Sequence, residues 1–457
     1  MRHRLTLARR CRLGIALAFI AATTWPGVSR AADDRYLFAA GASQAATLTL
    51  VATSGGAQAT WTAPATTRWD TALVGVQVSP AAPAGDAWID VVAGGGRVRQ
   101  HLDRGASGLR WLNVSRLRGS LSGGGTAVIV ALTTHGTTLR PGPAPVRLFA
   151  SELHRARPLL VLAPHPDDAE IAAFGLYAGQ PATIVTVTAG NAGDANYKDD
   201  FPADQRAEQY AFKGYLRALD SVTVPWQGGI PPQRCLNLGY FDARLQEMHD
   251  KPRTVFAEMY GPNQDVSRYR RVNLSRLLPS SARTATWAHL VDDLVQLLRK
   301  VRPAVIVMPH PILDGHSDHD YVTVAAEEAL RRWTQPVTVL LYTNHSAENL
   351  YPYGPADTDV SLPPWAVRDL PVQRVYSHPV DPELRRRKLY ALESMHDLRL
   401  SPREQSCGPG PRREDYPRLP DVDYFRRGPR PEELFFVYDR AGLREIVRDF
   451  LAHPPSP

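Results

Sequence analysis

The feature that most constrains the fold is a series of short apolar runs between residues 158 and 343. These runs are rich in aliphatic and β-branched residues and have the length of a strand: PLLVLA (158–163), ATIVTVTA (182–189), AVIVMP (304–309) and PVTVLLYT (336–343). Strands of this kind are covered on both faces. Amphipathic stretches lie between them, at 204–219, 287–300 and 320–333. The alternation predicts a Rossmann-like α/β fold, which is a mostly parallel sheet with helices on both faces.

Residues 32–155 show a different pattern. Short apolar or alternating runs, among them ATLTLVAT, TALVGVQV and TAVIVALTT, are separated by Gly-, Pro- and Ser-rich breaks. This pattern predicts an all-β sandwich or jelly-roll-like domain. Four tryptophans could give this domain a contact with carbohydrate, although packing in the core is the commoner fate of Trp in a sandwich. They are Trp61, Trp69, Trp88 and Trp111.

The first 31 residues predict a signal peptide. Arginines precede an apolar run at 13–22 that is too short to span a bilayer, and Ser29-Arg30-Ala31 offers a cleavage site. The chain has a net charge of +7, but six arginines and no acid lie in this segment, so the rest carries only +1. A nearly neutral remainder gives no electrostatic case for nucleic acid. We therefore expect an exported protein, periplasmic or secreted, that does not bind nucleic acid.

Four segments follow from these patterns. We expect the signal peptide at 1–31, the β-sandwich domain at 32–155 and the α/β domain at 156–400. The last segment, 401–457, combines a Pro- and Arg-rich loop with a closing strand and helix. The mature chain keeps two cysteines, Cys235 and Cys407, both in Pro/Gly-rich surroundings that predict loops. Export would permit a disulfide between them, and two free thiols are the equal alternative.

Polar clusters follow two of the predicted strands. The sequence HPDD (165–168) comes after LLVLA, and DGHSDHD (314–320) comes after VIVMP. The carboxyl ends of parallel strands meet at one edge of the sheet, where ligands bind. A third apolar run ends in His345, which we expect at the same edge as a substrate-binding candidate. Residues about 150 apart in the sequence are thus expected to converge.

These residue types indicate a zinc centre. Zn²⁺ binds imidazole nitrogen and carboxylate oxygen, and catalytic sites use three protein ligands with one open position. His165, Asp168 and His319 supply such a set for one ion per chain. Asp167 is then placed to take a proton from water, and His316 offers a second imidazole as an acid or as a cation facing an oxyanion.

Helix capping is the simpler explanation of the two aspartates, because acids are common at helix N-termini. Capping, however, accounts for none of the three histidines in the two clusters. Each cluster combines His with Asp directly after an apolar strand. This combination favours a metal site.

The motif PHPDDAEI resembles the AHPDD-x-E signature of the PIG-L/LmbE-like N-acetylglucosamine deacetylases, and HSDH resembles their second motif, H-x-D-H. Further matches in the same order are TVTAGNAGD (186–194), LGYFDARL (238–245), RPAVIVMPHP (302–311) and DPELRRRKLYALESMH (381–396). The resemblance covers roughly residues 158–400. It implies His165, Asp168 and His319 as metal ligands, Asp167 as the general base and His316 as the second imidazole. It also implies that Asp242 contacts the sugar.

The resemblance implies a zinc-dependent amide hydrolase that removes acetyl groups from GlcNAc-containing molecules. Export favours an envelope or extracellular glycan or glycolipid as the substrate. One alternative is another metal-dependent hydrolase such as a phosphoesterase, although no Gly-rich phosphate loop follows the first strand. The other alternative is an inactive glycan-binding protein that works through its β domain.

Overall fold

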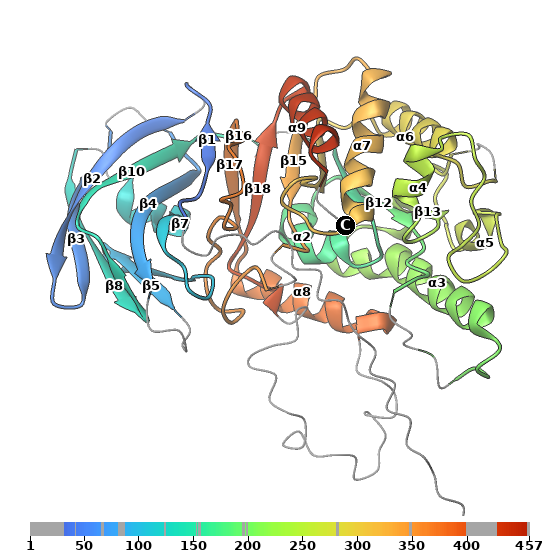
Figure 1. Cartoon of the computed structure of the whole chain (residues 1–457), viewed down its shortest axis with the longest axis horizontal. Helices are drawn as coiled ribbons and strands as arrows, with labels where there is room; N and C mark the ends of the chain where they lie inside the picture. Colours follow the sequence, from blue (N-terminus) through green and yellow to red (C-terminus); the bar gives the residue numbers. More distant parts are fainter. Residues whose placement is uncertain are drawn as a thin grey trace, which may run out of the picture.

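The computed structural model describes residues 32–454, except 42, 65–67, 81–86, 123–124, 152, 154–156, 194–196, 198–199, 280–282, 347–349 and 399–426. The predicted signal peptide and nearly all of the predicted Pro- and Arg-rich loop lie outside the described residues. Figure 1 shows a β-rich part, drawn mostly in blue, beside a mixed α/β part. Within the described residues, no helix is both long and apolar enough to cross a membrane.

The elements have the following bounds. The strands are β1 (Tyr36–Phe38), β2 (Gln44–Thr53), β3 (Gly56–Thr62), β4 (Thr71–Pro80), β5 (Trp88–Ala93), β6 (Gly96–His101), β7 (Gly108–Asn113), β8 (Ala127–His135), β9 (Thr137–Leu139), β10 (Gly142–Phe149), β11 (Leu159–Ala163), β12 (Ala182–Thr188), β13 (Cys235–Tyr240), β14 (Val305–Pro309), β15 (Thr338–Tyr342), β16 (Leu370–Val372), β17 (Arg374–Pro379) and β18 (Glu432–Tyr438). The α-helices are α1 (Arg118–Leu121), α2 (Asp168–Tyr177), α3 (Arg206–Thr223), α4 (Leu245–Asp250), α5 (Ser267–Arg270), α6 (Trp287–Val301), α7 (Ser317–Arg331), α8 (Pro382–Glu393) and α9 (Arg440–Ala452).

The α/β part is built on a seven-stranded mixed sheet in the order β13-β12-β11-β14-β15-β18-β17. The first five strands of this order are parallel, whereas β18 is antiparallel to β15 and β17 is antiparallel to β18. Every residue of β11, β12 and β14 is buried, because helices cover both faces of the sheet. The four apolar runs therefore form strands as predicted.

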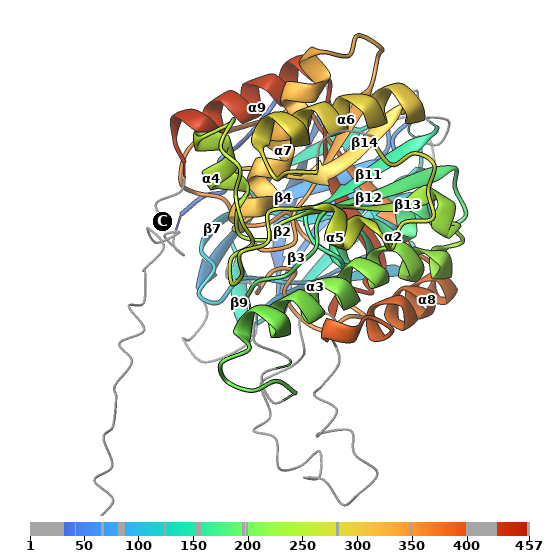
Figure 2. The same ribbon diagram turned by 90° about the vertical axis from the view of Figure 1, so that its right-hand side faces the viewer.

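Helices lie on both sides of this sheet, as Figure 2 shows. Helices α6, α7 and α9 lie on one side, and α2, α3 and α8 lie on the other. The predicted helices at 204–219, 287–300 and 320–333 correspond to α3, α6 and α7. The amphipathic pattern places their apolar side chains on the sheet.

The β-rich part is an antiparallel arrangement in the order β6-β5-β8-β3-β2-β10-β4-β7, with β9 beside β4. Strand β2 pairs with β10 along residues 44–50 and with β3 along residues 51–53. It thus joins two halves of the arrangement, one formed by β10, β4 and β7 and the other by β3, β8, β5 and β6. The apolar side chains of both halves form one core, which includes Val74 of β4 and Val91 of β5. Trp61, Trp69 and Trp111 are buried, as core packing predicts, while Trp88 is half-buried and stacks on His135.

The two parts share a core instead of standing apart. Tyr36 and Trp111 belong to the same apolar cluster as Leu370 and Phe436. Strand β1 does not pair within the β-rich part but runs parallel to β16, which lies about 330 residues later in the chain. Polar contacts add to this interface, since Asp359 accepts a hydrogen bond from the Arg99 backbone N–H at 2.8 Å.

Cys235 differs from its predicted loop position. It is the first residue of β13, it is buried, and it forms no disulfide with any described residue. Burial raises the pKa of this thiol, with a smaller contribution from the charge of Glu170. Cys407 lies outside the described residues, so the prediction about a disulfide is untested there.

Candidate metal centre

The predicted ligands come from two adjacent parallel strands. Strand β11 ends at Ala163, and His165 and Asp168 lie in the turn and first helical position that follow. Strand β14 is paired with β11 and leads to α7, which carries His319. The ends of the two strands meet at the same edge, so the predicted convergence of these residues is found.

Three ligand atoms form a compact triangle. His165 Nδ1 lies 3.2 Å from His319 Nε2 and 3.3 Å from Asp168 Oδ2, and His319 Nε2 lies 3.1 Å from Asp168 Oδ2. A tetrahedral zinc ion with bonds of about 2.0–2.1 Å holds its ligand atoms about 3.3–3.4 Å apart. The three residues are at most 6% exposed. The triangle therefore fits a metal ion of this size without rearrangement of the chain.

In both histidines of the triangle, the ring nitrogen that does not belong to the triangle lies next to a carboxylate. Asp314 Oδ2 lies 3.1 Å from His319 Nδ1. On the far side of His165, its Nε2 lies 3.2 Å from Asp242 Oδ1 and 3.4 Å from Asp318 Oδ2. Metal-binding histidines commonly direct their second nitrogen at a carboxylate, which fixes the ring and raises its basicity. This arrangement further supports a metal centre.

Asp168 is oriented by its neighbours. Asn344 Nδ2 donates to Asp168 Oδ1 at 2.8 Å, and the His165 backbone N–H donates to Oδ2, also at 2.8 Å. Sequence reasoning missed Asp314, Asp318 and Asn344. The signal was nevertheless present, because the first two lie inside DGHSDHD and the third directly precedes His345.

The cluster carries perturbed pKa values. Burial opposes the charged form of His319, but Asp168 and Asp314 outweigh it and raise its pKa to about 10. Burial likewise opposes the charged form of His165, and Asp242 and Asp168 raise its pKa. Burial favours the neutral acid at Asp168, yet the two imidazoles hold its pKa well below the usual range. The carboxylates thus stabilise positive charge between them, either as protons or as a metal ion.

Asp167 makes an ion pair with α3. It is the N-cap residue of α2 but makes no side-chain capping hydrogen bond within the described residues, so capping does not explain it. Its Oδ2 forms an ion pair with Arg217 of α3 at 2.9 Å. Its backbone has φ 149°, a conformation that is rare for residues with a side chain and common at functional sites. The sequence did not indicate Arg217.

His316 has a capping role that was not predicted. It is the N-cap residue of α7, and its Nδ1 accepts a hydrogen bond from the Asp318 backbone N–H at 3.2 Å. Burial and the positive charges of the neighbouring imidazoles lower its pKa to about 2. In the neutral ring the proton is on Nε2, which is then a hydrogen-bond donor, while the predicted role of His316 as an acid or a cation stays a prediction.

His345 also joins the cluster. Its ring centroid lies 4.6 Å from that of His319 and 5.3 Å from that of His316. A ligand atom of His345 lies within 4.8 Å of ligand atoms of Asp168 and His319. The structure thus brings this candidate to the site.

Asp242 lies beside His165, and its predicted contact with a sugar stays a prediction. Besides its contact with His165, its Oδ2 accepts a hydrogen bond from the Ala192 backbone N–H at 3.1 Å. Both carboxylate oxygens are engaged with the protein, and the residue is only 6% exposed. The geometry fits a residue that orients His165.

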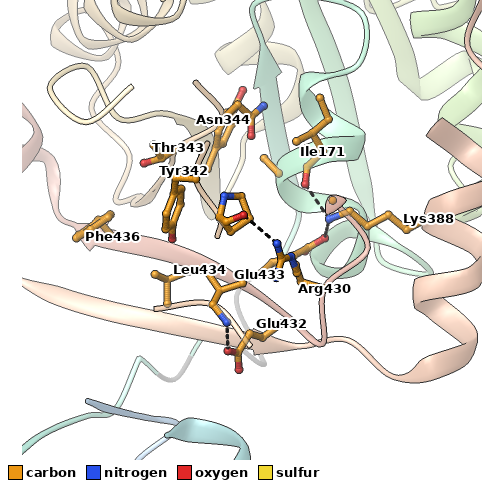
Figure 3. Close-up of a pocket in the computed structure, with 15 residues that line it drawn as sticks. Ile171, Tyr342, Thr343, Asn344, Lys388, Arg430, Glu432, Glu433, Leu434 and Phe436 are labelled. Carbon is orange, nitrogen blue, oxygen red and sulfur yellow. Dashed lines mark hydrogen bonds and ion pairs between the residues drawn. The ribbon is translucent and has the colours of Figure 1, made fainter. Parts of the chain in front are cut away.

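A pocket is lined by residues of α2, β15, α8 and β18, and Figure 3 shows this lining. It contains none of the three triangle residues, but Asn344 connects it to Asp168. Lys388 Nζ donates to the Ile171 carbonyl and to Glu433 Oε1, both at 2.7 Å. Because these charged groups bind each other and the backbone of α2, we assign the pocket lining a supporting role.

Comparison with known proteins identifies the segment that carries the cluster. Residues 160–330 match the family model described as PIG-L: GlcNAc-PI de-N-acetylase, which confirms the resemblance seen in the motifs. No curated protein matches the chain.

Solved structures with some similarity include 4-carboxy-2-hydroxymuconate hydratase (GalB) from Pseudomonas putida KT2440, with 14% identity over 52% of this chain and 78% of that chain and a TM-score of 0.29. Another is an acetyl xylan esterase (Est2A) from the rumen bacterium Butyrivibrio proteoclasticus, with 9% identity over 67% and 91% and a TM-score of 0.18. TM-scores this low support no structural argument.

Proposed function

Because residues 160–330 carry a PIG-L-type domain, we propose that the protein is a zinc-dependent N-deacetylase. Its substrate would be the acetamide of a GlcNAc-containing glycan or glycolipid in the cell envelope or outside the cell. The observation that carries the proposal is the triangle of His165, Asp168 and His319, with side lengths of 3.1–3.3 Å. The strand order of the seven-stranded sheet supports a Rossmann-like scaffold for this site.

Zinc held by the triangle would lower the pKa of a water molecule and polarise the acetamide carbonyl. Asp167 is the group we assign to take the proton of the attacking water. Its ion pair with Arg217, at 2.9 Å, holds the carboxylate in position.

We assign His316 the role of stabilising the negative charge that develops on the acetamide oxygen. Its ring centroid lies 4.6 Å from that of His165, and an N–H donor next to a forming oxyanion stabilises it without becoming charged. As the carbon–nitrogen bond breaks, the proton held by Asp167 passes to the leaving amine. The products are acetate and a free amine, and Asp167 returns to its ionised form.

The predicted signal peptide supports a location outside the cytoplasm. An enzyme exported to the periplasm or beyond meets envelope and extracellular glycans, which is why we favour them as substrates. We assign the β-rich part a structural role, because Trp61 and Trp69 are packed inside it and Trp111 is buried in the core that it shares with the α/β part. A carbohydrate contact would have to use other surfaces, or the half-buried Trp88.

The proposal is tested by measuring acetate release from GlcNAc-containing glycans, with and without a metal chelator. Asp167→Asn is expected to retain one zinc per chain while turnover falls about 10²- to 10⁴-fold, the range for loss of a general base. Asp250→Asn is the matched control, because Asp250 is exposed at the end of α4. Near wild-type turnover in Asp167→Asn would show that the base is wrongly assigned, and chelator-resistant activity would refute the metal mechanism.

A further inference from the structure

We propose that His345 is an additional ligand of the metal centre, so that the ion is bound by three imidazoles and one carboxylate; zinc in catalytic sites can expand to five ligands, which keeps a position for the attacking water. The inference rests on the proposed function in one respect, namely that the triangle binds a metal ion. It adds a residue from a third strand of the sheet, since His345 follows β15 while the triangle residues follow β11 and β14.

The backbone of His345 is fixed against the loop that leads to α7. Its carbonyl accepts a hydrogen bond from the Gly315 backbone N–H at 3.0 Å, and its own N–H donates to Asp314 Oδ2 at 3.4 Å. The same Asp314 oxygen lies 3.1 Å from His319 Nδ1. One buried carboxylate therefore sets the position of His345 relative to a triangle ligand.

The side chain lies near the two triangle residues that a new ligand would join. Ligand atoms of Asp168, His319 and His345 lie within 4.8 Å of one another. Two of these three residues belong to the triangle, so His345 lies within reach of the ion that the triangle would bind.

His316 lies at a similar distance but is less suited to this role. It groups with His165 and His319 within the same 4.8 Å. Its Nδ1 lone pair, however, accepts the capping hydrogen bond from Asp318, which leaves Nε2 protonated. A metal ligand must offer a lone pair, so binding through His316 would require the loss of this proton or of the cap of α7. His345 is therefore the better fourth ligand.

The test uses the full-length protein, stripped of metal and reloaded with Co²⁺, whose visible spectrum reports on coordination. The dissociation constant of Zn²⁺ is measured in parallel by competition with a chelator. His345→Ala is compared with wild type and with His453→Ala, a matched control whose side chain is 63% exposed at the end of α9. His345→Gln is measured as well, and it decides the question if the alanine variant does not fold.

We expect His345→Ala to weaken Zn²⁺ binding at least about 10- to 100-fold, the loss seen when even an outer partner of a ligand is removed. We also expect an altered Co²⁺ spectrum, while His453→Ala changes neither quantity. A superimposable spectrum and a dissociation constant within about twofold of wild type would overturn the inference and leave the proposed function intact. Failure of the wild-type protein to bind any metal would overturn both.

Discussion

Replacing Lys388 is expected to destabilise the helix that carries the proposed metal ligand Asp168. Lys388 reaches from α8 to the Ile171 carbonyl of α2 and to Glu433 of β18. Glu433 in turn accepts hydrogen bonds from the backbone N–H groups of Gly175 and Leu176 at 2.8 and 2.9 Å. The buried ion pair thus joins three elements, and one of its partners is the main chain of α2.

The change Lys388→Met keeps the length of the side chain but removes the charge. Glu433 is then left as a buried carboxylate without its cation, since the two side chains are only 1% and 3% exposed. Breaking a buried pair in this way costs about 3–5 kcal/mol of unfolding free energy. For a cooperative unit of about 400 residues, with an unfolding entropy of about 2.1 cal/mol/K per residue, the melting temperature should fall by about 4–6 °C.

Urea and thermal unfolding of the single variants Lys388→Met and Glu433→Gln and of the double variant form a double-mutant cycle. The double variant should lose less than the sum of the two singles, because no charge remains unpaired in it. Arg386→Met is the matched control on α8, since Arg386 and its partner Glu383 are both exposed. A loss in Lys388→Met no larger than in Arg386→Met would refute the reasoning.

Three further predictions concern the carboxylates around the site and between the two parts. Asp314→Asn should weaken zinc binding about 10- to 100-fold in a chelator competition, because it removes the charge behind His319; unchanged affinity would contradict this. Since Asp314 and Asp168 outweigh burial and raise the pKa of His319 to about 10, protons compete with the metal, and zinc affinity should rise from about pH 6 to about pH 9. An affinity that stays flat over that range would show that no such proton is displaced. Asp359→Ala removes the ion pair with Arg116 across the interface and should lower the unfolding free energy by about 2 kcal/mol in calorimetry, whereas a change below about 0.5 kcal/mol would mean that the shared core alone joins the two parts.

The parts of the fold that follow from local pattern were predictable. Strands β11, β12, β14 and β15 are apolar along their length, so each can be predicted from its own residues without knowledge of the neighbouring strands. Strands β1 and β16 have only three residues each, and each is defined by the other. Such pairing depends on the packing of the whole chain, and no sequence window contains it.

The same distinction holds at the site. The convergence of His165, Asp168 and His319 could be predicted because each combines a suitable residue type with a position at a strand end. The positions of Arg217 and Asn344 depend on how α3 and the segment after β15 pack on the other elements. The capping role of His316 was missed because Asp, Asn, Ser and Thr are the usual N-caps, and an imidazole nitrogen filled that place instead.

The pairing of β1 with β16 sets an order of events during synthesis. Strand β1 can pair with β16 only after about 330 further residues have been synthesised. At about 5–20 residues per second this takes on the order of tens of seconds. Until then Tyr36, which is buried against Phe436 in the folded protein, cannot make its native contacts in the core. Closure of this strand therefore cannot precede the synthesis of residues 370–372, and the burial of Tyr36 against Phe436 comes later still.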